Sequence, residues 1–182
     1  MPKLLNFALF QLGWLTCVLG GAWQLPWLGT LLATAIVGWH LLHAARPGSE
    51  LQLVLMASAL GAVWDSLLVA AGLLVYPSGT LLPGTAPHWI VAMWALFATT
   101  LNLSLDWLKG RYLLSALAGA AGGPLAFYAG MQLGGVRMPD PQAALLVLAA
   151  GWAVIMPLLV WLAQRYDGVR ETRAAPQALA GR

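Results

Sequence analysis

Six long apolar runs, separated by short polar breaks, dominate the sequence. A transmembrane helix needs about 20 mainly apolar residues, and each run is close to that length. The runs are Leu4 to Ala22, Leu25 to Ala44, Leu51 to Tyr76, Trp89 to Leu108, Tyr112 to Gly134, and Ala143 to Ala163. The breaks carry proline, glycine or charged residues, which are typical of turns where the backbone reaches water. The pattern predicts an all-α membrane protein, a bundle of six transmembrane helices over residues 1–164.

The composition supports the same fold class. Hydrophobic residues make up 60% of the chain and charged residues only 8%, against about 25% charged residues in soluble domains. So much apolar surface has to face hydrocarbon, which makes the lipid bilayer the first expected partner. Residues 165–182 form a basic tail rich in alanine, glycine and arginine, and we expect it to be disordered on the cytoplasmic side.

The positions of the basic residues predict the orientation of the bundle. With six spans and a cytoplasmic N-terminus, eight basic residues lie inside and only Arg137 lies outside. The eight are Lys3, Arg46, Lys109, Arg111, Arg165, Arg170, Arg173 and Arg182. The positive-inside rule therefore favours an N-in, C-in, multi-pass protein of a bacterial inner membrane. Because the basic residues are scattered at helix ends and form no patch, the net charge of +3 does not indicate a nucleic acid partner.

Asp65 is the most informative polar residue. It lies fifteen residues beyond Glu50, about 22 Å along a helix at 1.5 Å per residue, and so well inside the hydrocarbon layer. An aspartate at that depth costs roughly 2.5–3.5 kcal/mol on insertion scales, so its carboxyl group should face the bundle interior. Two roles stay open for it, a functional acid and a clamp that fixes helix packing.

Further polar and small residues predict a pocket around Asp65. Asn102, in the fourth run, is the expected amide partner of a buried carboxyl group or of a ligand. Ser115, Gly119 and Gly123 in the fifth run have the four-residue spacing of a close helix contact. Pro124 should kink that helix and free a carbonyl group beside the pocket. We therefore predict a polar site that combines Asp65, Asn102 and the segment Gly123–Pro124.

Asn6 and Gln11 in the first run are further candidates for this site. For both residues, and for Asn102, a tie between helices is the favoured role, because membrane helices use amides in this way.

The histidines supply part of a metal site. His40 and His43 are three residues apart and share one helix face, with Glu50 just beyond the next turn. A complete site needs more ligands, and the predicted topology puts His88 on the opposite side of the membrane. We therefore predict no metal site, and a position at the membrane interface for the histidine pair. The sequence has no phosphate-binding loop, no nucleophile motif and no cysteine pair, so no cofactor is expected.

Several of these positions carry a family resemblance. The sequence resembles a family of small bacterial inner-membrane proteins catalogued as a domain of unknown function, number 2878. The resemblance rests on Asn6, Phe10–Trp14, Glu50, Asp65–Ser66, Trp94–Asn102, and Gly122–Leu125 with Tyr128 and Gly130. It implies a multi-pass membrane protein. It also favours a functional role for Asp65, Asn102 and Gly123–Pro124, without indicating what that role is. It also hints at a link with lipid metabolism.

Three functions remain open at the level of sequence. The protein binds or transports a small molecule or lipid, with Asp65 taking part, as a mid-membrane acid and an interrupted helix favour. Alternatively, it is a membrane enzyme or accessory subunit in lipid or fatty-acid modification. The reacting groups would then be Asp65, as an acid or base, or the group of His40, His43 and Glu50. The third alternative is a structural partner subunit of a membrane complex.

Overall fold

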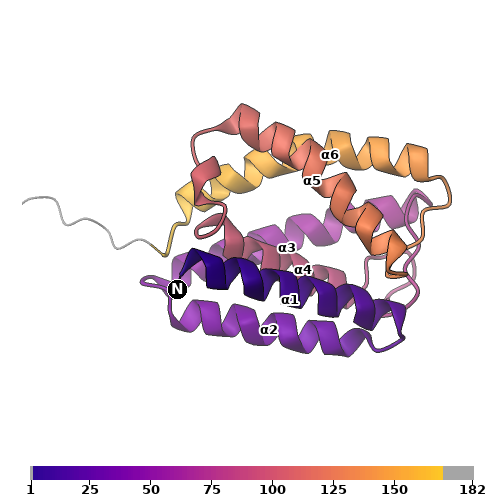
Figure 1. Cartoon of the computed structure of the whole chain (residues 1–182), viewed down its shortest axis with the longest axis horizontal. Helices are drawn as coiled ribbons and strands as arrows, with labels where there is room; N and C mark the ends of the chain where they lie inside the picture. The colour runs from indigo at the N-terminus through magenta and orange to yellow at the C-terminus, as the bar shows by residue number, and fades with distance from the viewer. Residues whose placement is uncertain (1, 170–182) are drawn as a thin grey trace, which may run out of the picture.

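Six α-helices make up the fold, and all six predicted apolar runs are helical (Figure 1). The computed structural model describes residues 2–169. The helices are α1 (Lys3–Ala22), α2 (Pro26–Leu42), α3 (Pro47–Ala70), α4 (His88–Leu101), α5 (Tyr112–Gln132) and α6 (Pro141–Arg165), with a short 3-10 helix, η1 (Asp106–Leu108). Between residues 2 and 169 the only β pairing is an isolated bridge from Val75 to Arg137, which joins the two long loops.

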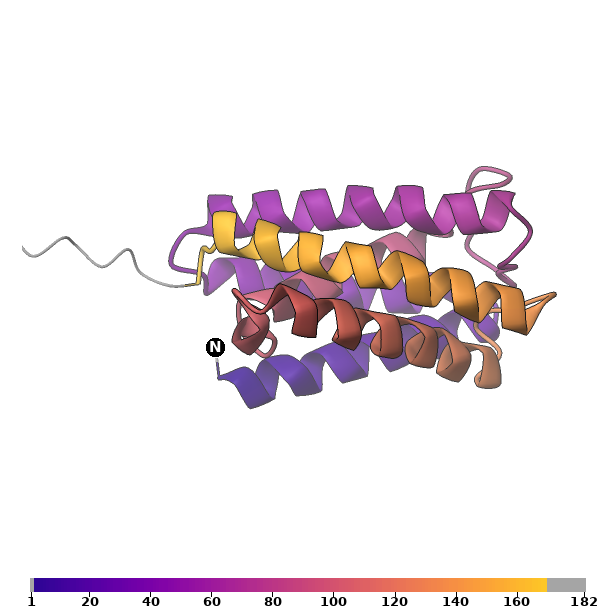
Figure 2. The ribbon, with the colours of Figure 1, turned by 90° about the horizontal axis from the view of Figure 1, so that it is seen from above.

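Successive helices run in opposite directions, so the start of α1 and the end of α6 lie at the same end of the bundle (Figures 1 and 2). The helices α1 to α4 pack against one another, whereas α5 packs mainly on α6. The molecule therefore has two parts, a four-helix part (α1–α4) and a hairpin (α5–α6). The helix axes of the two parts come close at few points, and large side chains fill the space between them.

Four of the helices, α1, α3, α5 and α6, are long and apolar enough to cross a membrane. The apolar helices α2 and α4 have 17 and 14 residues, or about 26 and 21 Å at 1.5 Å per residue, against a hydrocarbon thickness of about 30 Å. Large apolar side chains cover the outside, and Leu4, Leu42 and Leu113 are each more than three-quarters exposed. Such a surface is that of a protein embedded in a membrane.

Two helices, α3 and α4, end more than one helical turn earlier than the sequence pattern predicts. The third run extends to Tyr76, but α3 ends at Ala70, and Gly72 follows with a φ of +71°. Glycine adopts this left-handed conformation without strain, so it stops the helix. The fourth run extends to Leu108, but α4 ends at Leu101 and the chain turns into η1. Asn102 is therefore the residue that caps α4 and does not lie in mid-helix.

Glycines make room for tryptophan rings at several helix contacts. A Cβ atom added to Gly61 would lie 2.0 Å from the Trp94 ring. A Cβ atom added to Gly123 would lie 2.3 Å from the Trp152 ring. Gly151 accommodates Trp64 in the same way. At these positions, a small residue marks the place where a large side chain from a neighbouring helix packs.

The predicted close contact of the Ser115, Gly119 and Gly123 face is confirmed, and its partner is α6. A Cβ atom on Gly119 would lie 2.3 Å from the backbone oxygen of Trp152. Ser115 and Gly119 are both buried on this face. The backbones of α5 and α6 therefore meet at Gly119, as the four-residue spacing indicates.

The first residues of the predicted tail are attached to the bundle. The backbone N–H of Arg46 donates to the oxygen of Gly168 at 2.8 Å, and the N–H of Gly168 donates to Glu50 Oε1 at 2.8 Å. The Lys109 ammonium group also donates to the Asp167 carboxylate at 2.8 Å. The prediction of disorder does not hold for Tyr166–Gly168, because each of these residues is hydrogen-bonded to the bundle. Residues 170–182 lie outside the described residues.

Candidate functional site: an aromatic cavity beside Asp65

Asp65 is fully buried in α3, as its predicted interior position requires. Its two oxygens accept hydrogen bonds from different elements, Oδ2 from the Trp94 indole N–H at 2.7 Å and Oδ1 from the Tyr76 hydroxyl at 2.9 Å. Two accepting oxygens are the arrangement of an ionised carboxylate. Gly61, one turn earlier on α3, leaves the space into which the Trp94 ring fits.

Tyr76 lies in the loop between α3 and α4 and keeps its proton. Burial and the neighbouring Asp65 carboxylate raise the pKa of Tyr76 well above its ordinary value. The hydroxyl group therefore remains a hydrogen-bond donor to Asp65 throughout the neutral range.

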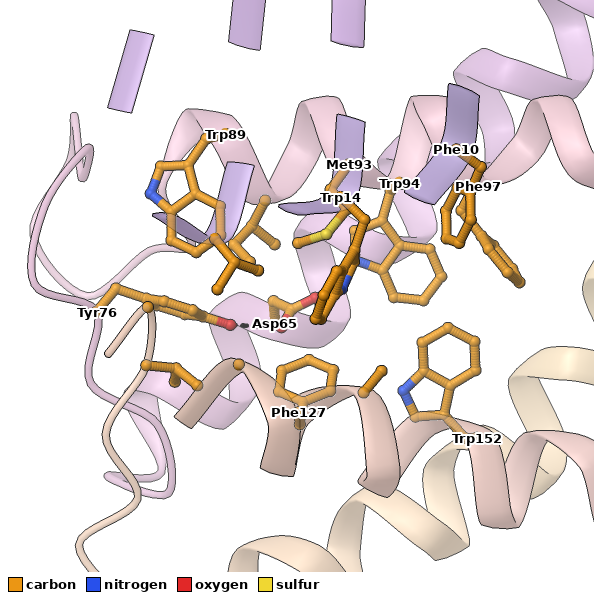
Figure 3. A pocket seen from close by; sticks show the side chains of 16 residues that line it. Phe10, Trp14, Asp65, Tyr76, Trp89, Met93, Trp94, Phe97, Phe127 and Trp152 are labelled. Atoms are coloured by element: carbon orange, nitrogen blue, oxygen red, sulfur yellow. Dashed lines mark hydrogen bonds between the residues drawn. The ribbon is translucent and has the colours of Figure 1, made fainter. Parts of the chain in front are cut away.

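A cavity of about 100 Å³ lies beside this carboxyl group, between the four-helix part and the hairpin (Figure 3). Eight of the residues that line it are aromatic: Phe10, Trp14, Tyr76, Trp89, Trp94, Phe97, Phe127 and Trp152. Trp94 and Trp152 stack across the gap with ring centroids 4.9 Å apart, and Tyr76 meets Trp89 edge to face at 5.5 Å. Among the described lining residues, Asp65 alone has a carboxyl group, and none is basic.

One side of the cavity reaches the outside of the molecule. Ala126 on α5 lines the cavity and is exposed, while Phe10 and Trp14 on α1 line it and are half-buried. The lining residues that reach the surface on this side thus lie on α1 and α5, on the lateral surface that faces hydrocarbon if the helices cross a membrane.

One polar atom of the wall is left without a partner. The indole nitrogen of Trp152 is buried, and no hydrogen bond to it occurs among the described residues. A buried N–H group of this kind is able to bind an acceptor atom of a ligand or of water.

The predicted pairing of Asp65 with Asn102 is wrong. Asn102 donates from Nδ2 to Glu50 Oε1 at 2.6 Å, and His40 Nε2 lies 2.8 Å from Glu50 Oε2. The reason is the antiparallel register of α3 and α4: Asn102, at the end of α4, lies beside the start of α3. Asp65, about 22 Å further along α3 than Glu50, meets Trp94 instead.

Glu50 is therefore the centre of a second buried polar cluster, which we call the Glu50 cluster and define by Glu50, His40, Asn102 and Gly168. Glu50 is completely buried, accepts hydrogen bonds from Asn102 and Gly168, and lies within hydrogen-bond distance of His40. Asn102 also donates to the backbone oxygen of Tyr166 at 3.3 Å. The cluster connects α2, α3 and α4 with the segment that follows α6.

Gly123 and Pro124 do not line the cavity. Gly123 packs against Trp152, and Pro124 lies within α5, which continues to Gln132. The cavity wall on α5 begins at Ala126 and includes Phe127 and Gly130. The part of the prediction that placed Gly123–Pro124 in the pocket is therefore wrong by about one helical turn.

The remaining candidates fall into different environments. Asn6 is buried and connects α1 to α4, since it donates to the backbone oxygen of Thr99 at 3.2 Å and accepts from Ser104 Oγ at 2.8 Å. Asn6 therefore ties two helices together, which is the role that the sequence favours for it. Gln11 is exposed on α1 and lies away from the cavity lining.

His43 is exposed and contacts the backbone oxygen of Trp39, so of the histidine pair only His40 faces Glu50. His88 lies at the opposite end of the bundle, where its Nδ1 is 2.7 Å from Thr30 Oγ1. Within residues 2–169, no group of three or more His, Cys, Asp or Glu side chains is placed to hold a metal ion.

Sequence reasoning missed the aromatic wall and the Tyr76 partner of Asp65, and it considered a tryptophan partner without identifying Trp94. One signal was available: Gly61 lies one turn from Asp65 on the same face, and a small residue next to a buried acid leaves room for a large donor. Which tryptophan fills that room depends on the end of α4, and the hydropathy pattern does not locate that end.

Fold and site together define a small all-helical protein with an apolar exterior and an aromatic cavity that holds one buried acid. A family model described as protein of unknown function (DUF2878) matches residues 3–158. The chain belongs to this family, as the resemblance in its sequence implies. Comparisons with curated proteins and with solved structures found no match.

Proposed function

We propose that the protein crosses the bacterial inner membrane six times, with both ends in the cytoplasm. The basic residues support this orientation, because Lys3, Arg46, Lys109, Arg111 and Arg165 all lie at the end of the bundle where α1 starts and α6 ends. Arg137 lies in the loop at the other end. The short helices α2 and α4 complete the crossing with their flanking loop segments.

We infer that the protein binds a small apolar molecule, or the apolar end of a lipid, in the aromatic cavity. The observation that carries this proposal is a cavity walled by eight aromatic side chains, some of whose lining residues on α1 and α5 reach the surface. Ligand sites are typically apolar hollows with a few placed polar groups. Asp65 and the indole N–H of Trp152 are such groups.

The size of the cavity limits what enters it. A volume of about 100 Å³ holds roughly three or four non-hydrogen atoms at the ~30 Å³ that a water molecule occupies in the liquid. Whole ligand pockets are larger, at about 300–1,000 Å³. The cavity therefore receives one end of a molecule whose remainder lies between α1 and α5.

A small aryl diazirine tests the proposal by photolabelling the protein in lipid nanodiscs. Gly130→Leu should block the cavity, since Gly130 lines it and a Cβ atom there would meet only Val136 at 3.7 Å. We expect saturable labelling of Trp14 and Phe127 in the wild type and loss of that labelling in Gly130→Leu.

Gly122→Leu is the matched control. Gly122 is on the same helix, it is exposed, and a Cβ atom there meets nothing within 4 Å. This variant should retain the labelling. Labelling of the cavity residues that never saturates, or that Gly130→Leu leaves intact, would show that the cavity binds nothing.

A further inference from the structure

We propose that the cavity selects an organic cation, namely a compact ammonium head without N–H groups, such as trimethylammonium, on an apolar chain or ring. This inference rests on the proposed function, because it names the class of ligand that the same cavity takes. Its basis is the combination of a buried carboxylate and aromatic walls around one small space.

The first step of the argument is charge. Asp65 is completely buried, and both groups that bind it, Trp94 and Tyr76, are neutral. The described residues that line the cavity include no lysine, arginine or histidine. The carboxylate therefore has two hydrogen bonds but no countercharge, and the Coulomb attraction between it and a cation is stronger in a low-dielectric site of this kind than it would be in water.

The second step is the wall. The faces of tryptophan and tyrosine rings attract cations within about 6 Å of the ring centroid, and quaternary ammonium ligands are bound in aromatic cages in this way. Figure 3 shows Tyr76, Trp89 and Phe127 around the side of the cavity on which the Asp65 carboxyl group lies. An anionic ligand would meet like charge from Asp65 in the same space.

The third step separates a quaternary ammonium from a primary amine. Each of the three N–H groups of a buried primary ammonium needs an acceptor. Of the roughly four lone-pair sites on a carboxylate, Trp94 and Tyr76 already occupy two on Asp65, which leaves too few for all three. A trimethylammonium head has no N–H group and needs only the field of the carboxylate and the ring faces. Its four non-hydrogen atoms also suit a cavity of about 100 Å³.

Competition against the aryl diazirine photolabel tests the inference. Phenyltrimethylammonium and tert-butylbenzene have the same shape, but only the first is charged. We expect Asp65→Asn to weaken competition by phenyltrimethylammonium about tenfold or more, because the attracting charge is gone. Competition by tert-butylbenzene should change little. Comparing each compound with itself across the two proteins cancels its partitioning into the bilayer.

Two controls keep the result interpretable. Asp106→Asn removes the same charge near the start of α1, where Asp106 pairs with Lys3, and it should leave both competitors unchanged. Benzenesulfonate, an anion with the same ring, should not compete in the wild type. This second control needs no variant, so it decides the question even if Asp65→Asn fails to fold.

The outcomes separate this inference from the proposed function. If the photolabel enters the cavity but benzenesulfonate competes as well as phenyltrimethylammonium, selection for a cation is wrong while binding stands. Equal weakening of both competitors by a folded Asp65→Asn variant would also overturn the inference. If no saturable labelling occurs at all, the proposed function itself fails.

Discussion

Two completely buried carboxyl groups lie about 22 Å apart on α3, and their surroundings differ. Glu50 has three donors or potential donors around it, from His40, Asn102 and Gly168. Asp65 has two neutral donors and a cavity beside it. A fully enclosed acid with many partners suits a structural role, whereas an acid next to a space suits ligand binding.

At the residue scale, Glu50→Ala should lower the free energy of unfolding by about 3–5 kcal/mol. The reason is that the buried N–H groups of Asn102 and Gly168 lose their acceptor. Thermal unfolding in detergent measures the effect. Gln52→Ala, two residues along α3 and exposed, is the control and should change little. Equal midpoints for the two variants would mean that the Glu50 cluster does not stabilise the fold.

Asp65→Asn should fold, with a loss of about 1 kcal/mol. The amide oxygen is able to accept from Trp94, whose N–H only donates, while the amide nitrogen donates to the Tyr76 hydroxyl, which also accepts. Asp65→Leu should cost more, because it leaves both partners unsatisfied. The order of the two thermal midpoints checks this, and an Asn variant no more stable than the Leu variant would contradict the hydrogen bonding described for Asp65.

At the element scale, helix identity follows from the sequence, but helix ends do not. The six apolar runs became six helices because long apolar stretches have few alternatives to a helix. The end of α4 at Leu101 coincides with the Glu50 cluster, in which Asn102, the residue after the helix, donates to Glu50. The interior position of Asp65 was predictable, because exposing a carboxyl group to hydrocarbon is costly. Its partners were not, because they depend on the register of α3 against α4 and on a loop residue, Tyr76.

The α5–α6 contact gives a prediction at the same scale. Gly119→Leu should destabilise the protein by about 1–3 kcal/mol, since the new side chain meets the backbone of Trp152, which cannot move aside as a flexible side chain does. Gly122→Leu, three residues later and open, should be neutral. Thermal midpoints in detergent compare the two, and matching values would show that the helices are further apart at Gly119.

At the scale of the whole molecule, the even number of antiparallel helices puts both described ends on one side (Figure 1). Reporter fusions after Arg46, Lys109 and Arg182 should therefore all read cytoplasmic, as the distribution of basic residues favours. A fusion after Arg137 should read periplasmic. A periplasmic signal from the fusion after Arg182 would require an odd number of crossings and would refute the six-span topology.

The division into a four-helix part and a hairpin explains why a cavity exists. Helices within each part pack closely, while the parts meet through aromatic side chains around Trp94 and Trp152. The cavity is thus a property of the whole arrangement, and α1 and α5 determine what reaches it.

Native mass spectrometry of the protein released from its own membrane tests the central claim, that this cavity binds a molecule, most directly. The account predicts a bound small molecule on the wild type and on Gly122→Leu, and its loss from Gly130→Leu, because only the last side chain occupies the cavity. A wild-type protein without any bound molecule, or a Gly130→Leu variant that retains it in full, would contradict the account.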